Sequence, residues 1–116
     1  MPDSPKPAVE VFFTPEFKRN IRALAKKYHH IQSDVQPFID QIQRGELIGD
    51  KVQGTGYTIF KVRIRNSNVS RGKSGGYRVI YYLKTATVVI LVTIYSKTEQ
   101  SDISSAKIKK ILSEFK

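Results

Sequence analysis

Hydrophobic residues near the start of the chain follow first a strand period and then a helix period. Residues 9–13 alternate with the two-residue period of a short strand, which ends before Thr14. From Phe17 and Ile21 onwards, apolar residues recur at helical spacing, with Thr14 as the expected N-cap and Pro15 in the first turn. The pattern predicts a strand followed directly by an amphipathic helix.

A second helical stripe runs from Val35 to Ile42 and is expected to end at Gly45. Asp34 is the expected N-cap, because this choice places Pro37 in the first turn, where its missing N–H removes little. Two consecutive amphipathic helices predict a helical hairpin.

Three further strands are predicted at residues 57–65, 77–84 and 87–96, and a last helix is marked by Ser104 as its N-cap. The last two strands are joined by a tight turn, which favours an antiparallel meander. We therefore expect an α+β fold in which the helical hairpin and the C-terminal helix pack with a mostly antiparallel four-stranded sheet.

Length and composition favour one domain. The chain has 116 residues, 40% of them hydrophobic, which suits one compact core at residues 8–116. Residues 1–7 contain three prolines and are expected to form a mobile arm. The absence of cysteine excludes disulfides and thiolate zinc sites. No apolar run approaches the roughly 20 residues of a membrane helix, so a cytoplasmic protein without a membrane partner is expected.

Charge narrows the class of partner. The net charge is +10 and the pI is near 9.9, which is typical of proteins that bind polyanions. No acidic residue lies between Asp50 and Glu99. The basic residues of that interval are Lys51, Lys61, Arg63, Arg65, Arg71, Lys73, Arg78, Lys84 and Lys97.

Strand alternation predicts that many of these cations share one sheet face. In the strand at residues 57–65, Lys61, Arg63 and Arg65 point away from the apolar side. Arg78 and Tyr82 take the same side of the next strand. If the helices cover the apolar side, the cations meet on an open side, and Arg78 is expected to point to solvent.

The last strand and one loop add to this face. Tyr95 and Lys97 are expected on the cationic side, away from Val92. Arg71 and Lys73 lie in a glycine-rich loop between two strands.

Such a face has two interpretations: a solvated surface, or a phosphodiester site. Clustered cations repel one another, and no carboxylate is expected beside them, since Glu99 is more simply read as a surface partner of Lys97. Guanidinium groups suit phosphate and tyrosine rings can stack on bases, so we favour a site for RNA.

These segments resemble the RelE/ParE toxin superfamily, and in particular the HigB-type branch of RelE toxins. The resemblance covers nearly the whole chain after residue 7 and rests on FKVRIR (60–65), GGYRVIYY (75–82), IYSK (94–97) and SDIS (101–104). It implies an mRNA interferase, an endoribonuclease toxin that cuts mRNA in the A site of the 30S ribosomal subunit and inhibits translation. It also implies a cognate antitoxin, as in type II toxin–antitoxin systems.

By position, Lys61, Arg63 and Arg78 correspond to basic catalytic residues of the family. The implied mechanism needs no metal or other cofactor: the 2′-hydroxyl attacks the adjacent phosphate, and Lys61 assists its deprotonation if neighbouring cations favour the neutral amine. Arg63 and Arg78 would stabilise the developing charge, and Tyr95 or Lys97 would assist the leaving oxygen. The residues expected to bind RNA around this centre are Arg65, Arg71, Lys73 and Tyr82.

Two positions depart from RelE. Thr98 stands where RelE has an arginine, and Ser104 stands where it has a tyrosine, for which Tyr95 is the candidate replacement. The predicted fold and basic face are also compatible with two other functions. One is a ParE-like inhibitor of DNA gyrase, and the other is a non-catalytic RNA-binding module. An antitoxin partner is expected to carry an acidic or amphipathic inhibitory segment that covers the basic face or displaces the last helix.

Overall fold

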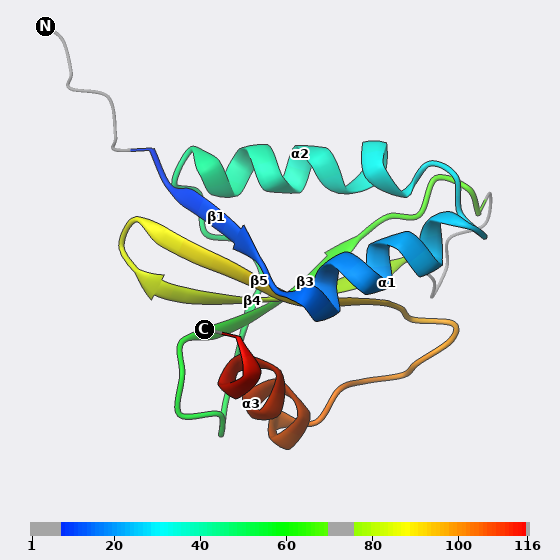
Figure 1. Cartoon of the computed structure of the whole chain (residues 1–116). Coiled ribbons are helices and arrows are strands. Elements are labelled where there is room, and N and C mark those ends of the chain that lie inside the picture. The colour runs from blue at the N-terminus through cyan, green and yellow to red at the C-terminus, as the bar shows by residue number, and fades with distance from the viewer. Residues whose placement is uncertain (1–7, 70–75, 116) are drawn as a thin grey trace, which may run out of the picture.

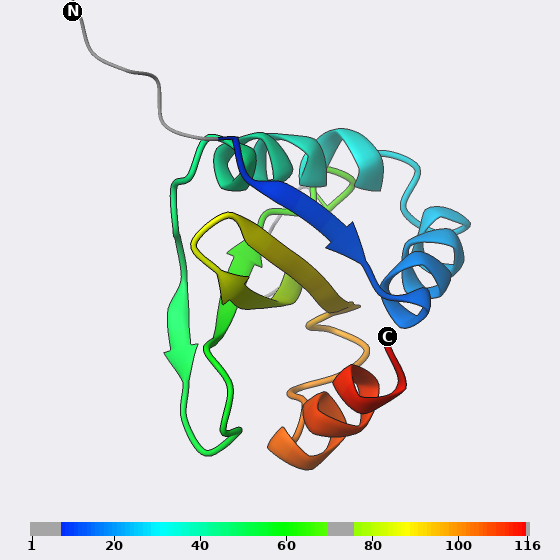
Figure 2. The same cartoon turned by 60° about the vertical axis from the view of Figure 1, so that its left-hand side comes forward.

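A five-stranded sheet lies between two helical layers in the computed structural model, which describes residues 8–69 and 76–115 (Figures 1 and 2). β1 runs parallel to β5, and every other neighbouring pair is antiparallel. Across the sheet the strands are β1 (Glu10–Phe13), β5 (Val88–Ser96), β4 (Tyr77–Thr85), β3 (Ile59–Ile64) and β2 (Asp50–Val52). The expected α+β fold is therefore confirmed, with one strand more than predicted.

The additional strand, β2, has only three residues and pairs with β3. It is too short for its alternation to be recognised in the sequence. Gly49 precedes it with φ +103°, and a Cβ there would come within 2.6 Å of the Lys61 carbonyl oxygen. This close approach explains why a glycine stands at this point of the turn-rich segment.

The first helix, α1 (Pro15–Ala25), begins as predicted. The Thr14 hydroxyl accepts a hydrogen bond from the Phe17 amide at 3.0 Å and donates one to the Val92 carbonyl at 2.6 Å. One buried side chain thus caps α1 and ties it to β5.

The second helix, α2 (Ile31–Gln43), begins earlier than predicted, and Asp34 is not its cap. Ile31 is fully buried, which draws the first turn into the core. The Asp34 carboxylate instead accepts a hydrogen bond from the Ser67 amide at 2.9 Å, and Pro37 lies inside the helix. The expected end is confirmed, because Gly45 has φ 87° and its amide donates to Ile42.

The helices cover both faces of the sheet, with α1 and α2 on one side and α3 (Ser105–Glu114) on the other (Figure 1). Ser104 caps α3 as expected, since its hydroxyl accepts from the Lys107 amide at 3.1 Å. The core beneath α3 comprises Ile59, Ile80, Val92, Tyr95, Ile108, Ile111 and Leu112. The predicted cationic face is therefore open only in part. Within the described residues, no helix is both long and apolar enough to cross a membrane.

Candidate functional site

A row of polar side chains crosses three strands on the sheet face that carries α3. In the β-sheet register Arg63 lies opposite Arg78, and Arg78 lies opposite Tyr95. Lys61 is two residues before Arg63 on the same face of β3. We call Lys61, Arg63, Arg78 and Tyr95 the cationic row. Antiparallel pairing thus brings together residues that are up to 34 positions apart in the sequence.

Arg78 is buried, with 9% of its surface exposed, and the expectation that it points to solvent is wrong. It lies on the central strand, with a neighbouring strand on each side and α3 over part of the same face. Its Nη1 donates to the Tyr77 carbonyl at 3.3 Å. Arg63 and Arg65, in contrast, are exposed. The row therefore has one guanidinium held by the fold and one that is accessible.

Tyr95 is also buried and belongs to the core beneath α3. The β4–β5 register shifts between Ile80 and Tyr81, so Tyr95 shares this core with Val92, contrary to the simple alternation. Its hydroxyl has no hydrogen-bond partner among the described residues. Burial raises the pKa of Tyr95, the Asp102 carboxylate raises it further, and Arg78 lowers it. The group keeps its proton at neutral pH.

A carboxylate that strand alternation does not place on this face lies at the row. Asp102 Oδ1 is 3.2 Å from Lys61 Nζ, so the expectation of a face without a paired carboxylate is wrong. A hydrogen bond from the Ile103 amide lowers the pKa of Asp102, and the Lys61 ammonium group lowers it further. Asp102 follows the last strand in the connection to α3, where strand alternation says nothing about side-chain direction.

The same connection fixes Lys97, whose Nζ donates to the Ser101 carbonyl at 2.6 Å. Glu99 does not pair with Lys97 as predicted. It lies 3.2 Å from Lys27 and, by that hydrogen bond, raises the pKa of Lys27. Thr98 is exposed and its hydroxyl is 3.0 Å from that of Ser96.

The remaining RNA-binding candidates lie apart from the row. Tyr82 packs edge-on against Tyr57, with ring centroids 5.2 Å apart, beyond Ile80 along β4. An open pocket of about 350 Å³ lies at the C-terminal end of α3, and its lining includes Tyr57, Tyr82 and Lys84. Arg71 and Lys73 lie outside the described residues.

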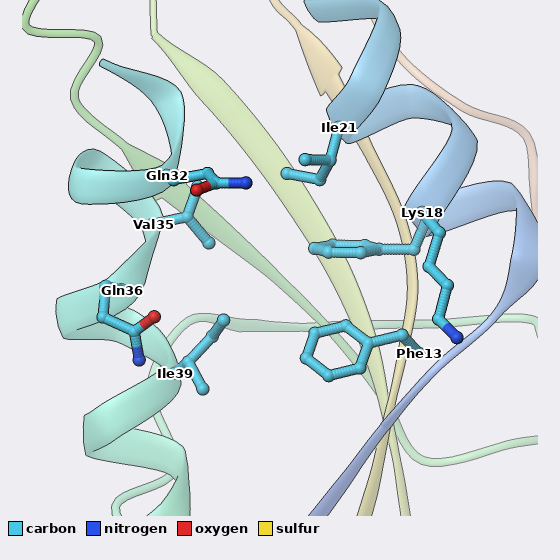
Figure 3. Close-up of a pocket in the computed structure, with 8 residues that line it drawn as sticks. Phe13, Lys18, Ile21, Gln32, Val35, Gln36 and Ile39 are labelled. Carbon is cyan, nitrogen blue, oxygen red and sulfur yellow. The ribbon is translucent and has the colours of Figure 1, made fainter. Parts of the chain in front are cut away.

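A second pocket, of about 400 Å³, lies on the opposite side of the sheet between α1 and α2 (Figure 3). Figure 3 shows Ile21 of α1 facing Val35 and Ile39 of α2, with Phe13 of β1 below and Lys18 at the side. The lining is mainly apolar and includes no acid and base pair. Among the described residues, no group of three or more His, Cys, Asp or Glu side chains could hold a metal ion.

The sequence matches one family over almost its whole length. The family is described as the RelE toxin of the RelE/RelB toxin–antitoxin system, and its model matches residues 9–114. The matched segment includes all five strands and all three helices described above. Its description also implies an antitoxin as partner. Fold and match together show that the chain belongs to the RelE toxin family, the toxins of RelE/RelB-type toxin–antitoxin systems.

Proposed function

We propose that this toxin is a cytoplasmic, ribosome-dependent endoribonuclease of the HigB type, which cuts mRNA in the A site of the 30S subunit and so inhibits translation. The observation that supports the proposal is the cationic row. Two guanidinium groups and a protonated tyrosine lie side by side in register, with Lys61 next to them. This set suits a phosphate that gains negative charge during a reaction.

The chemistry would be a transesterification within the RNA. The 2′-oxygen gives its proton to solvent water and forms a bond to phosphorus, and the bond from phosphorus to the 5′-oxygen breaks as that oxygen takes up a proton. The products are a 2′,3′-cyclic phosphate and a 5′-hydroxyl. Arg63 and Arg78 would stabilise the phosphorane, and Tyr95 or Lys97 would give or steady the proton on the leaving oxygen. We assign Lys61 to charge stabilisation, because its ammonium group forms an ion pair with Asp102 beside Arg63 and Arg78.

The row has no evident strong base, and this favours a requirement for the ribosome. Holding the 2′-hydroxyl in line with the leaving oxygen supplies much of the rate of such a reaction. RNA contacts outside the row would come from Arg65, Tyr82, Arg71 and Lys73. These contacts set where the message lies rather than how it is cut.

The test is an incubation of the purified chain with mRNA in the presence and absence of programmed ribosomes, next to a supercoiling assay with DNA gyrase. We expect cleavage with ribosomes, little cleavage of free mRNA, and unimpaired supercoiling. Blocked supercoiling with intact mRNA would favour a ParE-like inhibitor instead. Binding of RNA that weakens with salt and yields no product would favour a non-catalytic module.

We propose further that the antitoxin presents an acidic or amphipathic segment to this surface, because a protein of net charge +10 attracts such a segment strongly. A saturating amount of antitoxin should abolish the cleavage. Full cleavage by the saturated complex would exclude this mode of control.

A further inference from the structure

The ion pair between Lys61 and Asp102 joins the middle of β3 to the connection before α3. The two charged atoms are 3.2 Å apart, and 36% of the Lys61 side chain and 67% of the Asp102 side chain are exposed. An exposed pair of this kind contributes little to folding stability. Its position beside the cationic row therefore calls for another explanation.

The carboxylate has a second hydrogen bond within its own segment. Asp102 Oδ1 also accepts the Ile103 amide at 2.8 Å, and the Asp102 carbonyl accepts from the Gln100 side chain at 2.9 Å. Lys61, in contrast, carries its charge on a flexible four-carbon stem. In this pair Asp102 is the fixed member and Lys61 the member that becomes ordered.

Lys61 also has another carboxylate close by. Asp50 is its direct partner in the register of β2 and β3, yet the ion pair is made with Asp102. Both carboxylates repel a phosphate, so each should weaken RNA binding. Of the two, only Asp102 binds the ammonium group, and only Asp102 also raises the pKa of Tyr95.

We propose that Asp102 is a positioning residue for the cleavage reaction, holding the Lys61 ammonium group in place beside Arg63 and Arg78 while weakening the attraction for RNA. This inference rests on the proposed endoribonuclease function. An ammonium group already in place loses less freedom when it meets the phosphorane, which favours the chemical step. The hydrogen bond from Ile103 and the resulting low pKa of Asp102 keep the carboxylate charged at neutral pH.

The test compares Asp102→Asn with the matched control Asp50→Asn in single-turnover cleavage of ribosome-bound mRNA, over a range of complex concentrations. Each variant removes one negative charge near Lys61. Both should tighten half-saturation by roughly twofold, since a screened repulsion is lost. Only Asp102→Asn should also slow the maximal rate, by about tenfold or more. A merely electrostatic role for Asp102 would leave the maximal rate equal to that of Asp50→Asn and would overturn the proposal.

A double-mutant cycle shows whether Asp102 acts through Lys61. In a Lys61→Ala background, Asp102→Asn should cause no further loss of maximal rate, because the group that it positions is absent. An equal loss in both backgrounds would contradict the proposal. Each variant should melt close to the temperature of the unaltered chain, as is usual for surface substitutions, and this confirms that it is folded. If the unaltered chain cuts nothing, the proposed function itself fails, and this inference fails with it.

Discussion

Arg78 is a buried side chain at the centre of the cationic row, so its replacement should affect both folding and chemistry. Arg78→Ala removes a donor that would stabilise the transition state, and ribosome-dependent cleavage should fall about 100-fold or more. It also removes packing and a donor to the Tyr77 carbonyl, so the free energy of unfolding should fall by about 1–3 kcal/mol. Single-turnover cleavage and urea denaturation measure the two effects separately.

Arg63→Ala is the matched control, because Arg63 is exposed and lies directly opposite Arg78. It should reduce cleavage while changing stability by no more than about 0.5 kcal/mol. Wild-type cleavage by Arg78→Ala would remove Arg78 from the proposed chemistry. Should Arg78→Ala fail to fold, Arg78→Met keeps most of the buried stem and still tests the charge.

Tyr95 carries a buried hydroxyl that lacks a hydrogen-bond partner among the described residues. Tyr95→Phe should therefore keep or slightly raise the melting temperature, since an unsatisfied polar group leaves the core. If this hydroxyl protonates the leaving oxygen, cleavage should fall about 100-fold. A marked loss of stability without loss of cleavage would instead assign Tyr95 to the core alone.

The raised pKa of Tyr95 gives this role a pH signature. A donor that keeps its proton beyond the usual tyrosine pKa of about 10 should cause no decline in cleavage between pH 7 and 9. Cleavage by the unaltered chain that declines between pH 7 and 9, with no such decline in Tyr95→Phe, would mean that the hydroxyl ionises at a lower pH than its burial implies.

The sequence predicts the identities of the cationic row better than its environment. Period-two alternation places Lys61, Arg63 and Arg78 on one face, and pairing in register brings them together. Alternation does not reveal what covers a face, so the burial of Arg78 by its neighbours was not foreseen. Asp102 was missed because it lies after the last strand, where no period applies.

At the level of elements, Thr14 links α1 to the sheet through a buried hydroxyl that accepts one hydrogen bond and donates another. Thr14→Ala should lower the free energy of unfolding by about 2–4 kcal/mol, since it loses the cap and leaves the Val92 carbonyl without its donor. Ser104→Ala, which removes only an exposed cap of α3, should cost about 1 kcal/mol. Equal losses in urea denaturation would show that the bond to Val92 contributes nothing.

Strong local signals account for the elements that were predicted correctly. Thr14 followed by Pro15, and Gly45 with its positive φ, mark helix ends by their own chemistry. The predicted start of α2 is wrong because Ile31 is buried and belongs to the first turn. The burial of Ile31 offsets the cost of placing Pro37 inside the helix. β2 cannot be recognised in the sequence, because three residues are too few to show an alternation and the strand is defined by its pairing with β3.

At the level of the whole molecule, the net charge of +10 predicts RNA binding that weakens steeply with salt. Each lost contact to a single-strand phosphate should make the slope of log affinity against log salt less negative by about 0.7. Arg65→Ala, which removes an exposed cation just after β3 and outside the row, should show this change for a short single-stranded RNA. Arg19→Ala should not, because Arg19 lies on α1 and pairs with Glu16. Identical slopes for both variants would argue against RNA binding on this face.

The chemical ends of the cut message test the central claim most directly, namely that the cationic row catalyses attack by the 2′-hydroxyl on ribosome-bound mRNA. The fragments produced by the unaltered chain with programmed ribosomes are analysed for their terminal groups. We expect a 2′,3′-cyclic phosphate on the upstream fragment and a 5′-hydroxyl on the downstream fragment, with neither formed when ribosomes are left out. Fragments with 5′-phosphate ends, or a message that stays intact on the ribosome, would contradict this account.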